Sequence, residues 1–178
     1  MCVLIIKPEG VDIPSESMLD AAYTINHDGC GLLTPSMFYK GLSFPKFKRI
    51  LKEIDKDEPA IIHLRHATAG NVNLVNCHPF RRGDVWFAHN GTLELKPVGE
   101  MTDSETAFQT VIYPAIEEYG YGSDKVKEEI DKIIGTSKFA MMKDGEILMF
   151  GEYIKQPDGC YYSNLKFLNE SSCDPCRK

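Results

Sequence analysis

The chain has 178 residues, 43% of them hydrophobic, and its 26 acidic and 20 basic residues give a formal net charge of −6. A chain of this length buries about 70% of its unfolded surface as one compact domain, so we expect residues 1–178 to form a single domain. The acidic balance and the absence of a dense Lys/Arg cluster argue against nucleic-acid binding. We expect a small polar ligand instead.

The hydropathy pattern also excludes a membrane-spanning role. No apolar segment approaches the roughly 20 residues that cross a bilayer, and the first residues lack the basic-then-apolar layout of a secretory signal. We therefore expect a cytoplasmic protein whose six cysteines are free thiols. Cys173 and Cys176, in the polar tail 169–178, have the CxxC spacing of zinc and redox sites. Without a second such pair we expect no metal, although a zinc or partner-docking role for the tail remains an alternative.

Apolar runs and apolar spacing predict the secondary structure along the chain. The expected strands cover residues 2–6, 60–65, 85–89, 138–143, 146–150 and 159–163, with an Asp144-Gly145 hairpin turn between the fourth and fifth. The expected helices cover residues 17–24 and 46–54 and follow Asp103 and Ser123, two residue types that cap helices. Strands, then helices, then strands again indicate a mixed, layered α/β domain rather than regular βαβ winding.

Cys2 is the most informative residue of the chain. An initiator methionine is usually removed before a small residue, so loss of Met1 would leave Cys2 with a thiol and a free α-amine. An α-amine with a pKa of roughly 7.7 to 8.0 can accept the thiol proton during attack on a substrate. The alternative is a small buried hydrophobe at the start of a strand.

Polar clusters gather in presumed loops after the strands, where binding groups usually lie. Arg65 would clamp a carboxylate or form a structural ion pair. The Asn90-Gly91 step is either a hairpin turn or a pair of donors for an oxyanion. Asp103 either caps a helix or binds substrate, and His78 is either a pocket residue or an ordinary loop histidine. A further cluster, residues 26–31, reads as a turn that folds onto a neighbouring loop.

These motifs occur in the order Cys2, Asn26-x-Asp-Gly-x-Gly31, His63-x-Arg-x-Ala-Thr-x-Gly70, Asn76-x-His-Pro-Phe80, His89-Asn-Gly91 and Asp103-Ser-Glu105. In this order and approximate spacing, they resemble the class II glutamine amidotransferases, which belong to the N-terminal nucleophile hydrolases. The resemblance runs from residue 2 to residue 108. It implies an α+β fold, a four-layer αββα sandwich, and hydrolysis of glutamine to glutamate and ammonia.

The resemblance also implies roles for single residues. Cys2 would attack the γ-amide, and Asn90 and Gly91 would hold the oxyanion. Arg65 would pair with the α-carboxylate of glutamine and Asp103 with its α-ammonium. His78 and Thr68 would shape the same pocket. No metal and no organic cofactor enters this chemistry.

Two departures from the family pattern leave other functions open. The connection between Gly91 and Asp103 is short, and well-known members fuse this domain to a synthetase or phosphosugar-processing domain that consumes the ammonia. We therefore expect a glutaminase that supplies ammonia to a separate acceptor protein. The alternatives are a stand-alone amidase acting on a larger γ-glutamyl amide, and a non-catalytic glutamine-binding module.

Overall fold

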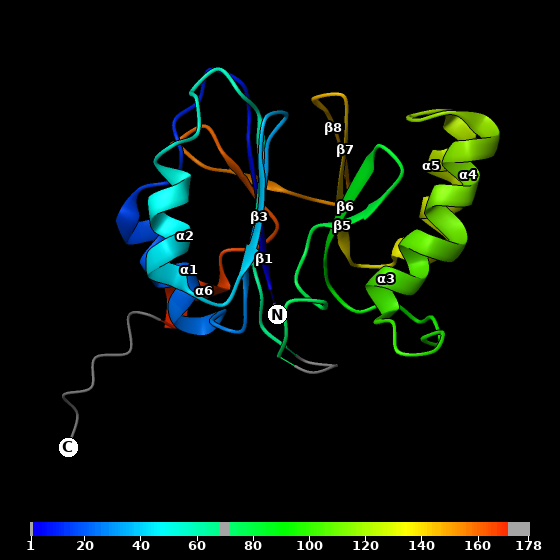
Figure 1. Cartoon of the computed structure of the whole chain (residues 1–178), viewed down its shortest axis with the longest axis horizontal. Helices are drawn as coiled ribbons and strands as arrows, with labels where there is room; N and C mark the ends of the chain where they lie inside the picture. Colours follow the sequence, from blue (N-terminus) through cyan, green and yellow to red (C-terminus); the bar gives the residue numbers. More distant parts are fainter. Residues whose placement is uncertain (1, 68–71, 171–178) are drawn as a thin grey trace.

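The computed structural model describes residues 2–67 and 72–170. Two antiparallel sheets lie face to face, and helices cover the outer face of each (Figure 1). This is the four-layer αββα sandwich that the family resemblance implies.

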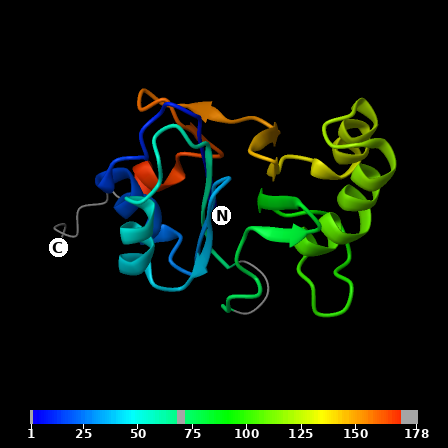
Figure 2. The same cartoon turned by 45° about the horizontal axis from the view of Figure 1, so that its top comes forward.

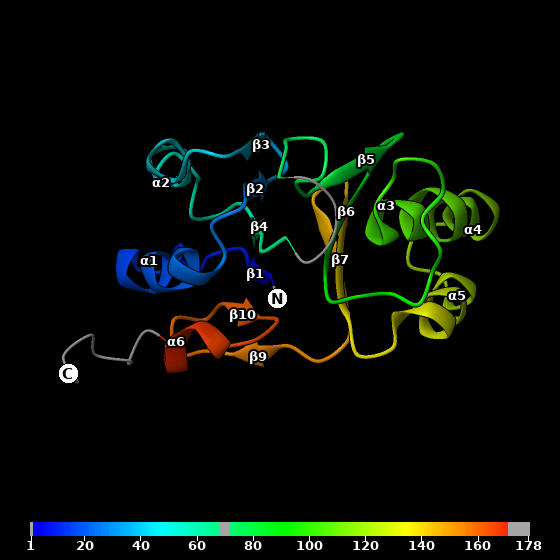
Figure 3. The ribbon, with the colours of Figure 1, turned by 90° about the horizontal axis from the view of Figure 1, so that it is seen from below.

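The first sheet contains the N-terminal strand at its interior. Its order is β3-β2-β4-β1-β10-β9, with all described pairs antiparallel. The strands are β1 (Val3–Lys7), β2 (Cys30–Leu33), β3 (Phe38–Gly41), β4 (Ala60–Leu64), β9 (Ile154–Lys155) and β10 (Tyr161–Tyr162). Its outer face is covered by α1 (Glu16–Ile25), α2 (Phe44–Leu51) and α6 (Lys166–Glu170), as Figure 3 shows from below.

The second sheet has the order β5-β6-β7-β8. Its strands are β5 (Phe80–Arg82), β6 (Val85–Asn90), β7 (Lys138–Lys143) and β8 (Glu146–Phe150). Its outer layer consists of α3 (Asp103–Ala107), a π-helical turn (Phe108–Ile112), α4 (Tyr113–Tyr119) and α5 (Asp124–Ile134). After β8 the chain crosses back to the first sheet, where β9 begins (Figure 2).

Strand β1 is apolar from Val3 to Ile6 because both faces of its sheet are covered. Successive side chains of a strand point to opposite faces. Val3 and Ile5 pack in the core beneath the helices, whereas Leu4 and Ile6 pack between the two sheets. The same alternation places Cys2 on the side that faces the second sheet.

The predicted elements are largely confirmed, with shifts at their ends. The helix expected at 46–54 begins at Phe44, because Pro45 is tolerated in a first turn, and it ends at Leu51. Strands β2, β3, β5 and β9 have two to four residues each and were missed. Residues 26–31, expected in a loop after a strand, instead follow helix α1 and lead into β2.

No helix within the described ranges combines the length and apolar content needed for a membrane crossing.

Candidate functional site

A pocket opens at the end of the sandwich where β1 begins. It encloses about 460 Å³, part of it open to solvent. Five residues predicted to form the site line it together: Cys2, Arg65, His78, Gly91 and Asp103. It is also lined by seven residues that were not predicted as site residues: His66, Ala67, Asn76, His89, Thr92, Thr102 and Ser104.

The Cys2 thiol is half-buried against the loop that follows β4. The backbone N–H of His66 donates to Cys2 Sγ at 3.4 Å, and Sγ lies 3.5 Å from the His66 carbonyl oxygen. Burial raises the pKa of the Cys2 thiol, while the His66 hydrogen bond and the Arg65 charge act in the opposite direction. Because burial dominates, this thiol needs a nearby base before it can attack a substrate.

Residues 26–31 hold the Arg65 loop in place. Arg65 N donates to Gly29 O at 2.8 Å, and Asp28 N donates to Arg65 O at 2.9 Å. The Asp28 carboxylate accepts a third hydrogen bond, from Ala67 N at 2.8 Å. These bonds fix the backbone from which the buried Arg65 side chain leaves the sheet. The expected fold of this segment onto a neighbouring loop is confirmed.

The Asn90-Gly91 step ends β6 and does not form a hairpin. Asn90 pairs with Lys138 on β7, and the chain then continues toward α3. Gly91 has a φ of +145°, and a Cβ there would collide with the Ser137 side chain, so this position requires glycine. Gly91 lines the pocket, whereas Asn90 is buried, with its Nδ2 2.7 Å from Ser163 Oγ.

Asp103 is the first residue of α3, and the alternative that it caps the helix is wrong. The cap is Thr102, whose hydroxyl accepts from Glu105 N at 3.2 Å. The Asp103 carboxylate instead accepts from Leu93 N and from Ser104 N, each at 2.8 Å. It therefore ties the connection after Gly91 to the start of the helix, with its carboxylate at the pocket.

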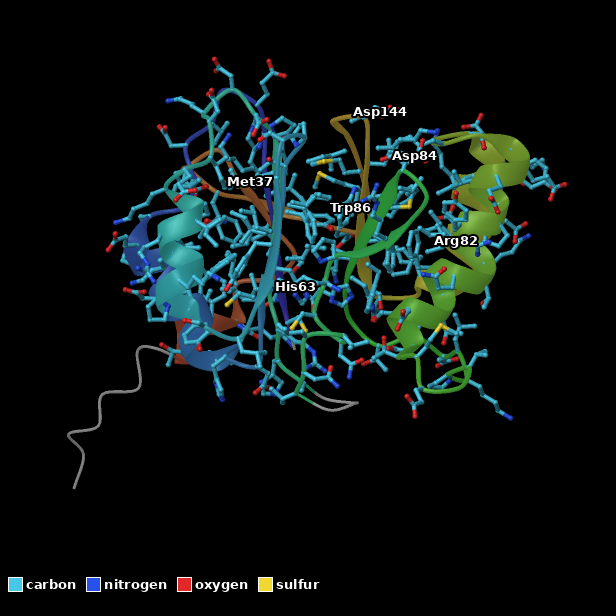
Figure 4. All side chains as sticks on the ribbon, viewed as in Figure 1. Met37, His63, Arg82, Asp84, Trp86 and Asp144 are labelled. Carbon is cyan, nitrogen blue, oxygen red and sulfur yellow. The ribbon has the colours of Figure 1, made fainter. Side chains whose placement is uncertain are left out.

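Three buried histidines stand at or beside the pocket. His63 Nε2 lies 3.2 Å from His89 O and so links the two sheets, and Figure 4 shows His63 between them. Burial lowers the pKa of His63 to about 3 and of His89 to about 4, and it lowers that of His78 well below its usual value. All three rings are therefore neutral at pH 7. His89 Nδ1 is 2.6 Å from Ser104 Oγ on α3.

His78 is held by a close backbone approach. Gly31 on β2 lies so near the His78 carbonyl that a Cβ would collide with it. Only glycine fits there without a backbone shift. Gly31, the last residue of the 26–31 segment, therefore lets the His78 loop lie close against the first sheet.

Two predicted features lie outside the described residues, namely Thr68 and the Cys173/Cys176 tail. Within residues 2–67 and 72–170, no three His, Cys, Asp or Glu side chains are arranged to hold a metal ion.

Sequence reasoning did not identify Ser163 and Asn164 as parts of this region. Asn164 Nδ2 donates to Cys2 O at 2.9 Å, and Ser163 Oγ accepts from Leu4 N at 2.9 Å. These contacts join residues 162 and 159 positions apart. No local motif signals them; only the pairing of β10 with β1 brings them together.

Parts of the chain are similar in sequence to curated proteins. Relatives include "Putative glutamine amidotransferase" of Haemophilus influenzae, 49% identical over 27% of this chain and 20% of the relative. "Putative glutamine amidotransferase YafJ" of Escherichia coli is 36% identical over 42% of this chain and 36% of the relative. The matched segments therefore span well under two thirds of these relatives.

Solved structures share the fold. A glutamine phosphoribosylpyrophosphate amidotransferase from B. subtilis superimposes with a TM-score of 0.62 at 18% identity, covering 95% of this chain and 43% of that chain. A structure described as the allosteric regulatory enzyme of purine biosynthesis has a TM-score of 0.56 at 18% identity, covering 91% and 41%.

The family model described as "Glutamine amidotransferases class-II" matches residues 46–151, more than half of the chain. This segment contains Arg65, His78, Asn90, Gly91 and Asp103. The chain therefore belongs to the class II glutamine amidotransferases.

Proposed function

We propose that residues 1–178 form one glutaminase domain in which Cys2, once Met1 is removed, hydrolyses the γ-amide of glutamine. The observation that carries this proposal is the meeting of Cys2, Arg65, Gly91 and Asp103 in one pocket. They come from four separate segments, and together they supply a nucleophile, a cation, a backbone donor and an anion. Glutamine offers a matching carbonyl, α-carboxylate and α-ammonium.

The reaction begins with transfer of the Cys2 thiol proton to the free α-amine of the same residue, through a water. The sulfur then attacks the γ-carbonyl carbon and forms the C–S bond. Asn90 and the Gly91 N–H stabilise the negative oxygen of the tetrahedral intermediate. The C–N bond breaks as the α-amine returns its proton to the leaving nitrogen, which departs as ammonia. Water hydrolyses the resulting thioester to glutamate and restores the thiol.

Substrate selection follows from two opposite charges that line the pocket. Arg65 pairs with the α-carboxylate in a two-point contact that its planar guanidinium favours. Asp103 pairs with the α-ammonium. The neutral His78 ring shapes the wall without adding a charge that would compete with either contact. We further propose that the ammonia passes to an acceptor site on a separate synthetase subunit in the cytoplasm.

The test is the intact mass of the protein before and after treatment with a glutamine-mimicking diazo-ketone, together with glutamate release from glutamine. We expect a mass without Met1, one adduct that glutamine blocks, and steady glutamate production. Cys2→Ala should abolish both adduct and turnover. Cys160→Ala removes a buried thiol that donates a hydrogen bond to Asp12 O, and this variant should retain both the adduct and the turnover. Retained Met1, with neither adduct nor turnover, would overturn the proposal in favour of a glutamine-binding module.

One observation favours a second candidate, an amidase for a larger γ-glutamyl amide. A groove adjoins the pocket and shares Asn76, Thr92, Thr102 and Asp103 with it. It encloses about 1300 Å³, part of it open to solvent. Its apolar lining consists of Val75, Leu93, Leu95, Pro97 and Met101. A substrate larger than glutamine has room there.

Competition separates the two candidates. If free glutamine is the substrate, its kcat/KM should exceed that of a γ-glutamyl anilide. A higher kcat/KM for the anilide, reduced by Leu95→Asp in the groove, would identify the amidase.

A further inference from the structure

Ser163 lies where the two sheets meet behind the nucleophile. It is buried and directly follows β10, and its backbone N–H donates to Leu4 O at 2.9 Å. Its hydroxyl oxygen lies 2.9 Å from Leu4 N on the nucleophile strand and 2.7 Å from the Asn90 amide on the second sheet. One hydroxyl therefore joins the strand of Cys2 to the strand of the proposed oxyanion donor.

The hydrogen-bonding capacity of this hydroxyl limits how Asn90 can be oriented. A serine hydroxyl has one proton to donate, whereas the Leu4 backbone N–H can only donate. If Asn90 also donates through Nδ2, the Ser163 proton needs another acceptor, and Asn90 Oδ1 stays buried without a hydrogen-bond partner among the described residues. A buried carbonyl without a partner is unfavourable.

The opposite orientation of the amide gives the Ser163 proton an acceptor and makes the amide group without a partner a donor instead of an acceptor. The oxygen and nitrogen of an asparagine amide occupy nearly equivalent positions, so the hydrogen-bond network decides between them. With Oδ1 toward Ser163, the hydroxyl donates to Asn90 and still accepts from Leu4 N. The group left over is then the Asn90 NH₂, which is a donor, and an oxyanion is stabilised by donors.

We propose that Ser163 is a positioning residue for the reaction. Its hydroxyl, fixed by Leu4 N, donates to Asn90 Oδ1 and keeps the Asn90 NH₂ available for the oxyanion. This inference rests on the proposed function, in which Asn90 and Gly91 hold that oxyanion. Asn164, the next residue, adds to the same arrangement by donating to Cys2 O at 2.9 Å.

The test is a double-mutant cycle on glutamine hydrolysis by the full chain, with Ser163→Ala, Asn90→Ala and the double variant. Loss of an oxyanion donor lowers kcat by about a hundredfold or more. We expect Ser163→Ala to lower kcat by about tenfold to a hundredfold through that donor, with KM changed less than about twofold. In the Asn90→Ala background the same substitution should change kcat less than about twofold, because its partner is already absent.

A matched control is Tyr162→Phe, which removes a neighbouring buried hydroxyl bonded to Asp158 rather than to Asn90. It should reduce thermal stability without reducing kcat. Ser163→Thr keeps a hydroxyl and should restore most of kcat. If Ser163→Ala does not fold, Ser163→Cys, with a similar size but a weak donor, should show the kcat loss.

The outcomes separate this inference from the proposed function. A wild-type protein that hydrolyses glutamine, with Ser163→Ala or Ser163→Cys at wild-type kcat, overturns the role of Ser163 alone. Losses that multiply in the double variant also overturn it, because Ser163 would then act independently of Asn90. A wild-type protein with neither glutamine hydrolysis nor the Cys2 adduct overturns the proposed function and this role together.

Discussion

Arg65, the residue proposed to bind the α-carboxylate, is held in place by its neighbours. Its backbone is held on both sides by the 26–31 segment, and its buried side chain lines the pocket that contains Cys2. A fixed backbone and restricted side chain reduce the entropy lost when a carboxylate binds. The charge of Arg65 also acts on Cys2, because it opposes the rise in the thiol pKa caused by burial.

Arg65→Lys should raise the KM for glutamine by about tenfold, because lysine cannot make the planar two-point contact. The kcat should change less, since the α-carboxylate is remote from the reacting carbon. Steady-state kinetics of glutamate release measures both constants.

The matched control is Arg81→Lys, on β5. The Arg81 guanidinium lies 4.9 Å from the Trp86 ring centre and donates to Gly83 O. Its replacement should leave KM unchanged. An unchanged KM in Arg65→Lys would rule out the α-carboxylate contact.

Strand β1 shows how one element connects the site to the rest of the fold. Cys2 directly precedes β1, and Lys7 is the last residue of the strand. The buried Lys7 Nζ donates to Lys56 O and to Glu58 O, each at 2.6 Å. These bonds attach the loop after α2 to the end of the strand.

Lys7→Met should lower the free energy of unfolding by about 3 kcal/mol, because buried carbonyls lose their donor. Urea denaturation followed by circular dichroism measures the change. The KM for glutamine should stay the same in the folded variant.

Lys56→Met is the control for this substitution. Lys56 is exposed and pairs with Asp12 at 2.9 Å, a surface contact worth about 0.5 kcal/mol. Equal losses in the two variants would show that the Lys7 hydrogen bonds add no stability of their own.

At the scale of the whole molecule, the interface between the sheets depends on neutral histidines. His63 on the first sheet reaches the carbonyl of His89 on the second, and His78 packs 4.4 Å from His63 between ring centres. Charging any of these rings would place a cation in a buried contact between layers. The packing of the two sheets is therefore sensitive to acid.

The free energy of unfolding should fall as the pH drops from about 6.5 to about 4. The unfolded chain binds protons at these histidines near pH 6.5, whereas the folded chain does so only near pH 4 for His89 and near pH 3 for His63. Each such histidine contributes a loss of about 1.4 kcal/mol per pH unit in this window.

Urea denaturation at pH 7.0, 6.0 and 5.0 measures this dependence. His63→Asn should reduce the slope by the contribution of one histidine, about 1.4 kcal/mol per pH unit. A free energy of unfolding that stays constant from pH 7 to pH 5 would contradict the assignment of neutral buried rings.

The sequence by itself determined the elements with a strong local period and the family to which the chain belongs. The apolar run of β1, the hairpin at Asp144-Gly145 and the Ser123 cap of α5 are all where spacing predicts them. Such features depend on neighbours within a few residues, which the sequence states directly. The order of the polar motifs likewise carried the family assignment, since several separate loops agreed.

Only the tertiary structure decided which of these loops meet and what each polar atom contacts. It showed that Thr102 caps α3 in place of Asp103, that Asn90-Gly91 is no hairpin, and that short strands such as β2 extend the first sheet. It also placed Ser163 against Asn90, 73 positions earlier in the chain. Contacts of this range depend on how the sheets are ordered and stacked, because no local backbone period relates residues so far apart.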